Sequence, residues 1–218
     1  MPILAIGGVR DEALLGHIAA FSGKPRPRLL WVGTAAAESA ETAAWIADAF
    51  GAIADVTTLN FFPWPPANLR ELVLAHEVIL VGGGNTANML AIWRVHAFDA
   101  LLHEAWERGV LLAGWSAGAI CWFEAGVTDS FGPQLAGMEC LGFLPGSACP
   151  HYDGEALRRP RYAQLLREGF PPGIAIDDDV AVRFDGRELT EVISVRPGAT
   201  AYRVGADGEQ ALDARLVS

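Results

Sequence analysis

The pentapeptide Gly114-Trp115-Ser116-Ala117-Gly118 constrains the fold of this chain more than any other stretch. An apolar run, residues 110–113, leads into it, and a helix-compatible stretch, residues 119–123, follows it. A G-x-S-x-G pattern in this context predicts a sharp strand-to-helix turn, because larger neighbours would collide with the strand or the helix. The alternative is a turn of small residues without chemistry.

Such a turn would expose two groups to a substrate. The Ser116 hydroxyl is directed out of the sheet, where it can act as a nucleophile. The N–H of Ala117 lies at the start of the helix, so it has no partner within the helix and carries the positive end of the helix dipole. It can therefore stabilise an oxyanion beside the serine.

Strand and helix patterns alternate through the first two thirds of the chain, which is typical of parallel β-α-β units. The sequence predicts an α/β fold with a mostly parallel central sheet covered by helices on both faces, in a single domain of residues 1–218. The predicted strands are 2–7, 29–33, 56–59, 78–81 and 110–113, and the predicted helices are 11–20, 38–50, 68–76, 86–93 and 97–108.

The last third of the chain has a different pattern. Residues 124–150 are rich in glycine and proline and predict loops and short strands, and residues 159–168 predict a helix. A short strand is expected at 173–176. Beyond it, the apolar runs 180–184, 189–195 and 200–204 are separated by Asp-Gly and Pro-Gly turns, which predicts a short antiparallel meander at the C-terminus.

The composition argues against several classes of partner. A net charge of -10 disfavours binding to nucleic acid and to anionic membrane surfaces. The apolar runs are strand length, far short of the ~20 residues of a membrane helix, and residues 1–8 predict a first strand, not a signal peptide. The three cysteines have no C-x-x-C spacing and predict neither disulfides nor zinc, so a reducing cytoplasm is expected. We expect a monomer or a small homo-oligomer.

A second glycine-rich turn, residues 82–86, follows the predicted strand 78–81. Glycines after a strand leave backbone N–H groups unobstructed, and turns of this kind can bind phosphate. This turn lacks both the G-x-G-x-x-G spacing and the P-loop lysine, so a nucleotide site is disfavoured and no cofactor is expected. The turn is better suited to supplying the second N–H of an oxyanion hole beside Ser116.

A serine nucleophile needs a base within hydrogen-bonding reach, and the base needs an orienting acid. His151 is the candidate base, because it follows a strand-like segment in a loop. The alternative is an exposed loop histidine without a role. The other four histidines lie in predicted helices: His17, His76, His96 and His103.

The candidate acid lies in the run Asp177-Asp178-Asp179, directly after the strand predicted at 173–176. Three adjacent carboxylates repel one another, so a hydrogen-bond donor or a cation must stabilise them. An imidazole N–H can be that donor for one of the three. The alternatives are an acidic turn or a metal site, but no second cluster of oxygen ligands accompanies it, so no metal is expected. The acid follows the histidine here, whereas the α/β-hydrolases have the reverse order.

The two glycine turns, Val81-Gly82-Gly83-Gly84-Asn85-Thr86 and residues 114–119, together with Pro150-His151-Tyr152, resemble the dipeptidase E family. Its members are aspartyl dipeptidases, serine peptidases with a fold like that of class I glutamine amidotransferases, and cyanophycinases are their relatives. The resemblance covers nearly the whole chain, and the two motifs are specific in combination.

The resemblance implies roles for particular residues. It places the nucleophile at Ser116, the base at His151, and the oxyanion donors at the N–H groups of Gly84 and Ala117. The acid of the family is commonly a glutamate, and Asp178 takes its position here. Because aspartate is shorter by one methylene, either the backbone approaches more closely or Asp177 has the role instead.

The resemblance also implies specificity for an N-terminal aspartate, whose carboxylate an arginine holds. Arg158 matches that position, with Arg159 as the second candidate, since a guanidinium suits bidentate carboxylate binding. The alternative is an ordinary helix surface. Asp129 resembles an acidic position that could hold the substrate α-ammonium. Asn85, in the second glycine turn, is a further candidate substrate-binding residue.

Together these features predict a serine exopeptidase that hydrolyses Asp-X dipeptides through an acyl-enzyme, without a cofactor or metal. Two alternatives stay open. One is cyanophycinase-like cleavage of β-aspartyl-arginine bonds, which the arginine-rich stretch after His151 disfavours. The other is a non-catalytic module that binds a small amino-acid ligand, which the presence of serine, histidine, acid and both glycine turns disfavours.

Overall fold

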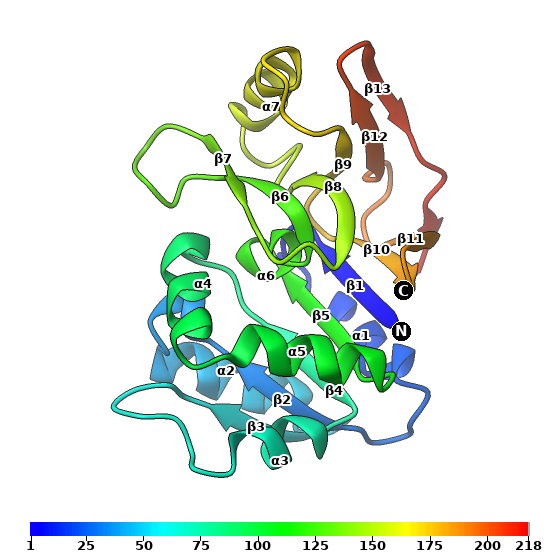
Figure 1. The fold of residues 1–218 in the computed structure, drawn as a ribbon. Coiled ribbons are helices and arrows are strands. Elements are labelled where there is room, and N and C mark those ends of the chain that lie inside the picture. The colour runs from blue at the N-terminus through cyan, green and yellow to red at the C-terminus, as the bar shows by residue number, and fades with distance from the viewer. Residues whose placement is uncertain (218) are drawn as a thin grey trace.

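The computed structural model describes residues 1–217, which form two β-sheets and the helices around them (Figure 1). The larger sheet has eight strands in the order β14-β11-β10-β1-β5-β4-β2-β3. Its strands are β1 (Pro2–Ile6), β2 (Arg28–Val32), β3 (Asp55–Leu59), β4 (Val78–Val81), β5 (Leu111–Trp115), β10 (Val180–Asp185), β11 (Glu188–Ser194) and β14 (Arg215–Leu216). Because β1 to β5 pair in parallel, the α/β fold with a mostly parallel central sheet is confirmed.

Helices cover both faces of this sheet, and the alternation of side chains along β1 shows why. Leu4 and Ile6 belong to a buried apolar cluster with residues of α1 (Ala13–Phe21) and α2 (Ala40–Phe50). Ile3 and Ala5 point the other way and belong to a second cluster. Successive strand side chains face opposite sides, so a strand that is apolar throughout must be covered twice. The helices of the second cluster are α3 (Leu69–Leu74), α4 (Thr86–Val95) and α5 (Phe98–Glu107).

The smaller sheet has six strands in the order β13-β12-β9-β8-β6-β7 and lies with α7 (Arg158–Arg167) in the upper half of Figure 1. Its strands are β6 (Phe123–Thr128), β7 (Ala136–Glu139), β8 (Leu144–Cys149), β9 (Gly173–Ile176), β12 (Ala201–Gly205) and β13 (Gly208–Ala211). The region of predicted loops and short strands, residues 124–150, thus supplies three strands of one sheet. β10 and β11 pair antiparallel in the larger sheet, as predicted, and β14 pairs in parallel with β11. The third predicted strand, β12, pairs with β9 and β13 in the smaller sheet, so the three C-terminal strands do not form one meander.

The helix after the G-x-S-x-G turn is shorter than the sequence predicts. It is α6 (Ala117–Ile120), and β6 begins at Phe123, inside the stretch expected to be helical. The apolar run 119–123 is buried in either conformation, so its composition does not distinguish a helix from a strand.

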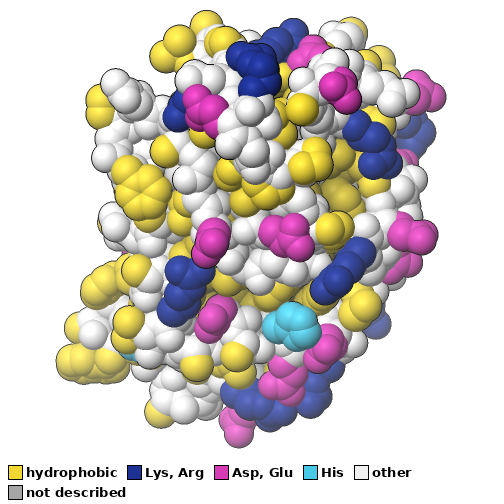
Figure 2. Space-filling view, turned by 45° about the horizontal axis from the view of Figure 1, so that its top comes forward, with side chains coloured by type: hydrophobic (Ala, Val, Ile, Leu, Met, Phe, Trp, Pro, Cys, Tyr) yellow, Lys and Arg dark blue, Asp and Glu magenta, His cyan; other side chains and the backbone are white. Residues whose placement is uncertain are grey.

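The surface carries charges of both signs. On the face shown in Figure 2, acidic and basic side chains of the described residues are interspersed, and the basic ones do not gather into one continuous stripe. None of the helices within residues 1–217 has the length and apolar character needed to cross a membrane.

Candidate active site

The turn between β5 and α6 brings Ser116 to the carboxyl end of the central sheet. Ser116 has φ 54° and ψ -114°, a sparsely populated conformation that costs about 1–3 kcal/mol. Its N–H donates to the carbonyl of Ile6 on the neighbouring strand, at 3.1 Å. Both flanking positions require glycine because the backbone is close. A Cβ at Gly114 would overlap the carbonyl of Gly118, and a Cβ at Gly118 would overlap the carbonyl of Val81. The local sequence thus forms the sharp turn that the motif predicts.

His151 and Asp178 meet at the same edge of the molecule. His151 follows β8 and Asp178 follows β9, and His151 Nδ1 lies 2.7 Å from Asp178 Oδ1. The His151 ring packs directly against the backbone of Gly8, just after β1, since a Cβ on Gly8 would lie 2.6 Å from His151 Nδ1. His151 adopts a positive φ of 52°. An aspartate in this contact orients the imidazole and stabilises its protonated form.

The other groups around Asp178 hold its carboxyl and backbone in place. Arg10 Nε lies 2.6 Å from Asp178 Oδ2, so each carboxylate oxygen has one partner. The N–H of Asp178 donates to Asp153 Oδ1 at 2.9 Å, and Arg196 Nη2 donates to the Asp178 carbonyl at 3.0 Å and also to Asp153. Burial raises the pKa of Asp178, but the hydrogen bond and charge of His151 and the Arg10 cation outweigh it, and the pKa lies below its ordinary value.

The two neighbouring aspartates have different roles. Asp177 Oδ2 accepts from the N–H of Thr200 at 3.0 Å, and burial raises the pKa of Asp177 above its ordinary value. Asp179 Oδ1 accepts from the N–H groups of Arg10 and Asp11, at 2.7 and 3.0 Å. Of the three consecutive carboxylates, the one that contacts His151 is therefore Asp178.

Two backbone N–H groups near Ser116 are free to bind an anion. Within residues 1–217, neither the N–H of Gly84 nor that of Ala117 donates a hydrogen bond to another group of the protein. Gly84 has φ 135°, and a side chain there would overlap the carbonyl of Ala35, so this position requires glycine. The two glycine turns also approach each other, since a Cβ at Gly83 would lie 3.2 Å from Ser116 Cβ.

A polar cavity of about 270 Å³ joins these groups. Its lining includes six of the residues that the sequence predicts for the site and two others, Ser130 and Glu155. The six are Gly84, Asn85, Ser116, Asp129, His151 and Arg158. In the described structure Ser116 Oγ makes no hydrogen bond to His151, and both side chains face this cavity. In enzymes without bound substrate, catalytic hydrogen bonds are often long and tighten on binding.

The two candidate arginines lie in different surroundings. The side chain of Arg158 is buried at the cavity, with Nε 2.8 Å from Glu155 Oε2 and Nη1 donating to the Val127 carbonyl at 2.9 Å. Arg159 is not in the cavity lining; its guanidinium lies over the rings of Tyr152 and Tyr202, 4.6 and 5.0 Å from their centroids. The structure therefore brings Arg158, and not Arg159, beside Ser116 and His151.

Asn85 and the segment that contains Asp129 form another wall of the cavity. The side chain of Asn85 caps α4 by accepting from the Asn88 N–H at 2.9 Å, and its Nδ2 donates to the Ser130 carbonyl at 2.9 Å. Ser130 Oγ in turn accepts from the N–H of Ala87, at 3.2 Å. These bonds hold Asp129 at the cavity, while Asn85 is engaged with the protein itself.

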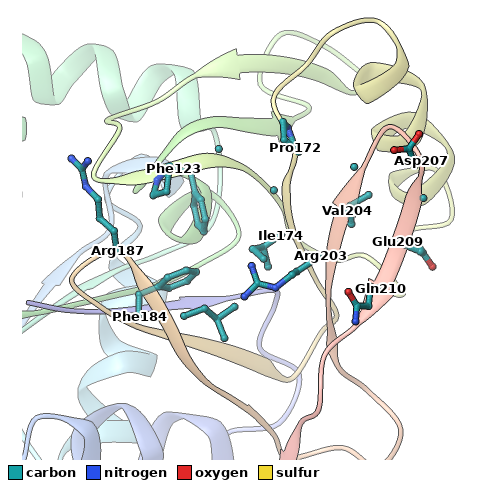
Figure 3. Close-up of a pocket in the computed structure, with 16 residues that line it drawn as sticks. Phe123, Pro172, Ile174, Phe184, Arg187, Arg203, Val204, Asp207, Glu209 and Gln210 are labelled. Atoms are coloured by element: carbon teal, nitrogen blue, oxygen red, sulfur yellow. The ribbon is translucent and has the colours of Figure 1, made fainter.

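A larger cavity, of about 750 Å³, lies away from these residues (Figure 3). Its lining includes Gly146 and Gly173, near the starts of β8 and β9, whereas His151 and Asp178 follow the ends of those strands. Figure 3 shows Phe123, Phe184, Ile174 and Arg203 around it. Because its lining contains neither a histidine nor a serine, we assign the chemistry to the smaller cavity.

Sequence reasoning missed several residues of the site. They are Arg10, Asp153, Glu155 and Arg196. Arg10 follows β1 at the carboxyl end of the sheet, where loops of α/β proteins carry function, and that rule could have indicated it. No signal in the sequence pairs Arg196 with Asp153, since both are ordinary surface residue types in polar segments.

The fold and the polar cavity define a class of protein: a mixed α/β enzyme-like scaffold with its site at the carboxyl ends of parallel strands. The sequence pattern of peptidase family S51 matches residues 3–192. The chain belongs to peptidase family S51, which makes it a peptidase and hence a hydrolase, and the resemblance to the dipeptidase E family is confirmed.

Individual relatives agree with this assignment. The chain is 46% identical over 210 residues to the uncharacterized peptidase YgaJ of Bacillus subtilis, which covers 93% of this chain and 91% of the relative. A shorter match, 34% identical over 84 residues, is to Peptidase E of Salmonella arizonae, covering 38% of this chain and 37% of the relative.

Solved structures show the same fold. A peptidase from an acI-B1 actinobacterium superposes with a TM-score of 0.68 at 20% identity, covering 98% of this chain and 94% of the other. A putative Peptidase E protein from Listeria monocytogenes superposes with a TM-score of 0.67 at 16% identity, covering 89% of this chain and 98% of the other.

Proposed function

We propose that this peptidase is a serine-type aspartyl dipeptidase, which cleaves Asp-X through Ser116, His151 and Asp178. The observation that carries the proposal is the 2.7 Å contact between His151 Nδ1 and Asp178 Oδ1 at the cavity that Ser116 also lines. A serine beside a histidine whose second nitrogen is held by a carboxylate is the arrangement that activates a serine nucleophile.

In the proposed reaction, His151 Nε2 accepts the Ser116 proton as the hydroxyl oxygen attacks the aspartyl carbonyl carbon. Asp178 stabilises the imidazolium that forms. The imidazolium then donates the proton to the leaving amine, and the peptide C–N bond breaks to leave an acyl-enzyme on Ser116. A water molecule repeats the sequence on the acyl-enzyme and releases aspartate.

The oxyanion of each tetrahedral intermediate would be bound by the N–H groups of Gly84 and Ala117. Both N–H groups are free within residues 1–217, and they flank Ser116 from two different turns. Loss of one such donor costs roughly 3 kcal/mol of transition-state stabilisation.

For specificity, we propose that Arg158 binds the substrate carboxylate and that Asp129 binds the α-ammonium. Both face the cavity, whose volume of about 270 Å³ suits a small substrate. The resemblance to the dipeptidase E family, whose members are aspartyl dipeptidases, supports this specificity. The contact between Arg158 and Glu155 means that a substrate carboxylate would compete with Glu155 for the guanidinium.

We further propose a cytoplasmic location, a monomer or small homo-oligomer, and no nucleic-acid partner. The location is supported by three cysteines that are all free thiols. The cyanophycinase-like alternative would need room for an arginine side chain, which the guanidinium of Arg158 in the cavity disfavours by like-charge repulsion.

Substitution of the nucleophile tests the proposal. We expect Ser116→Ala to lower hydrolysis of Asp-Leu by at least ~10⁴-fold. The melting temperature should stay within a few degrees, because the hydroxyl makes no hydrogen bond within residues 1–217. Ala-Leu and β-Asp-Arg are the comparison substrates for the wild-type enzyme. Undiminished turnover by Ser116→Ala would refute the mechanism, and faster cleavage of β-Asp-Arg than of Asp-Leu would favour the cyanophycinase-like alternative.

A further inference from the structure

Arg10 contacts the carboxylate that holds His151, although it is remote from Asp178 in the sequence. Its Nε lies 2.6 Å from Asp178 Oδ2, on the carboxylate oxygen opposite the one that His151 contacts. The Asp178 side chain is 3% exposed, whereas that of Arg10 is 64% exposed. The guanidinium therefore reaches a buried anion from the surface, where it is not needed to fill the core.

The backbone of Arg10 is held where this contact requires it. Asp179 Oδ1 accepts from the N–H groups of Arg10 and Asp11, and the segment before them pairs with the acidic turn through Gly8 and Asp178. On the other side, a Cβ at Gly154 would lie 2.7 Å from Arg10 Nη2. Gly154 thus leaves space for the Arg10 guanidinium, and the Asp179 carboxylate fixes the backbone from which the Arg10 side chain extends.

The charged groups around the Asp178 carboxylate come from four segments. They are Arg10 after β1, His151 and Asp153 after β8, Asp177 and Asp179 beside Asp178, and Arg196 after β11. Arg196 donates to the carbonyl of Asp178 and to Asp153. Among the described residues, Arg10 is therefore the one cation that bonds to the carboxylate itself.

We propose that Arg10 is a positioning residue that keeps Asp178 Oδ1 directed at His151 and opposes protonation of the His151–Asp178 pair. This role rests on the proposed serine-peptidase function. Without Arg10, the buried Asp178 carboxylate would attract a proton on the imidazole more strongly. Its Oδ1 would also be free to rotate away from His151. The permanent positive charge of Arg10 on the second oxygen offsets part of the attraction that the carboxylate exerts on a proton at the imidazole.

Three variants separate this role from a structural one. Arg10→Gln removes the charge, Arg10→Lys keeps it, and Arg28→Gln is the matched control, because Arg28 forms an exposed ion pair with Glu77 at the opposite ends of the strands. The measurement is kcat/KM for Asp-Leu as a function of pH, together with the pH dependence of Ser116 labelling by a serine-directed phosphonate. Thermal melting checks that each variant is folded.

We expect Arg10→Gln to lower kcat/KM roughly tenfold and to move the acid limb of both profiles upward by about half a pH unit, as one screened charge near the imidazole predicts. Arg10→Lys should keep the limb near its wild-type position, and Arg28→Gln should change neither profile. An unshifted limb in Arg10→Gln, or an equal shift in Arg10→Lys, would overturn the role of Arg10 alone. Absence of phosphonate labelling in the wild-type protein would overturn the proposed function and this role with it.

Discussion

At the scale of single residues, three consecutive aspartates show how position decides chemistry. Asp177 accepts a backbone N–H from Thr200, Asp178 contacts His151, and Asp179 holds the backbone at Arg10. The pKa of Asp177 is raised by burial, and that of Asp178 is lowered because its partners outweigh burial. The pKa values of these two identical side chains are thus shifted in opposite directions. The same substitution at each position can therefore distinguish their roles.

Replacing each carboxylate by its amide should have unequal effects. We expect Asp178→Asn to lower kcat/KM by about 10⁴-fold, because an amide cannot hold His151 in the tautomer that accepts the Ser116 proton. Asp177→Asn keeps an oxygen acceptor for Thr200 and removes a poorly solvated charge, so its kcat/KM should stay within about threefold of the wild-type value. Steady-state kinetics with Asp-Leu at pH 7 decides between the two residues; a larger loss in Asp177→Asn would make Asp177 the acid.

At the scale of elements, an ion pair joins the starts of β2 and β4. Glu77 precedes β4, and its carboxylate accepts from the N–H of Arg28 at 2.8 Å and from Arg28 Nη2 at 2.6 Å. The hydrogen bond from Arg28 lowers the pKa of Glu77 to about 2, against the opposing effect of burial. The pair lies at the end of the sheet away from the cavity, so it affects stability and not catalysis.

The lowered pKa determines the pH range in which this pair contributes. Because the folded-state pKa of about 2 lies below the unfolded value, the contribution is complete above about pH 4.5 and is lost as pH falls toward 2. Urea midpoints should therefore show Glu77→Gln less stable than the wild type at pH 7 and equal to it near pH 2. Glu139→Gln is the control, since Glu139 forms no ion pair within residues 1–217. A gap that persists unchanged to pH 2 would contradict the assignment.

At the scale of the whole molecule, one apolar cluster connects the two sheets. It contains Ile3 and Ile79 of the larger sheet and Leu144 and Ile174 of the smaller one. Trp122, between α6 and β6, is fully buried and stacks against Trp93 at a centroid distance of 6.5 Å. A shared core makes the unfolding of either sheet alone expose apolar surface of the other.

The shared core predicts a single unfolding transition for the 218-residue chain. Differential scanning calorimetry should give one peak, with a calorimetric enthalpy of about 150 kcal/mol near 60 °C and a calorimetric to van't Hoff ratio near 1. Two resolved peaks would mean that the two sheets unfold as separate units, against the single domain that the sequence predicts.

The sequence by itself determined the features that depend on neighbours along the chain. The alternation of strands and helices through β5 follows from hydrophobic periodicity, and the turn at Ser116 follows from the small residues on either side of it. Both are local requirements, so the α/β fold could be predicted without knowing which strands pair. Even the candidate base, His151, was indicated by its place just after a strand.

Only the tertiary structure decided which distant groups meet. The partners of Asp178 lie 27 residues away at His151 and 168 residues away at Arg10, and no local pattern relates these positions. The same holds for the division of the C-terminal strands between two sheets, because β10 pairs with β1 whereas β12 pairs with β9. Long-range pairing depends on how whole elements pack against a common core. Side-chain periodicity shows which face of an element is buried, but it does not show which other element covers that face.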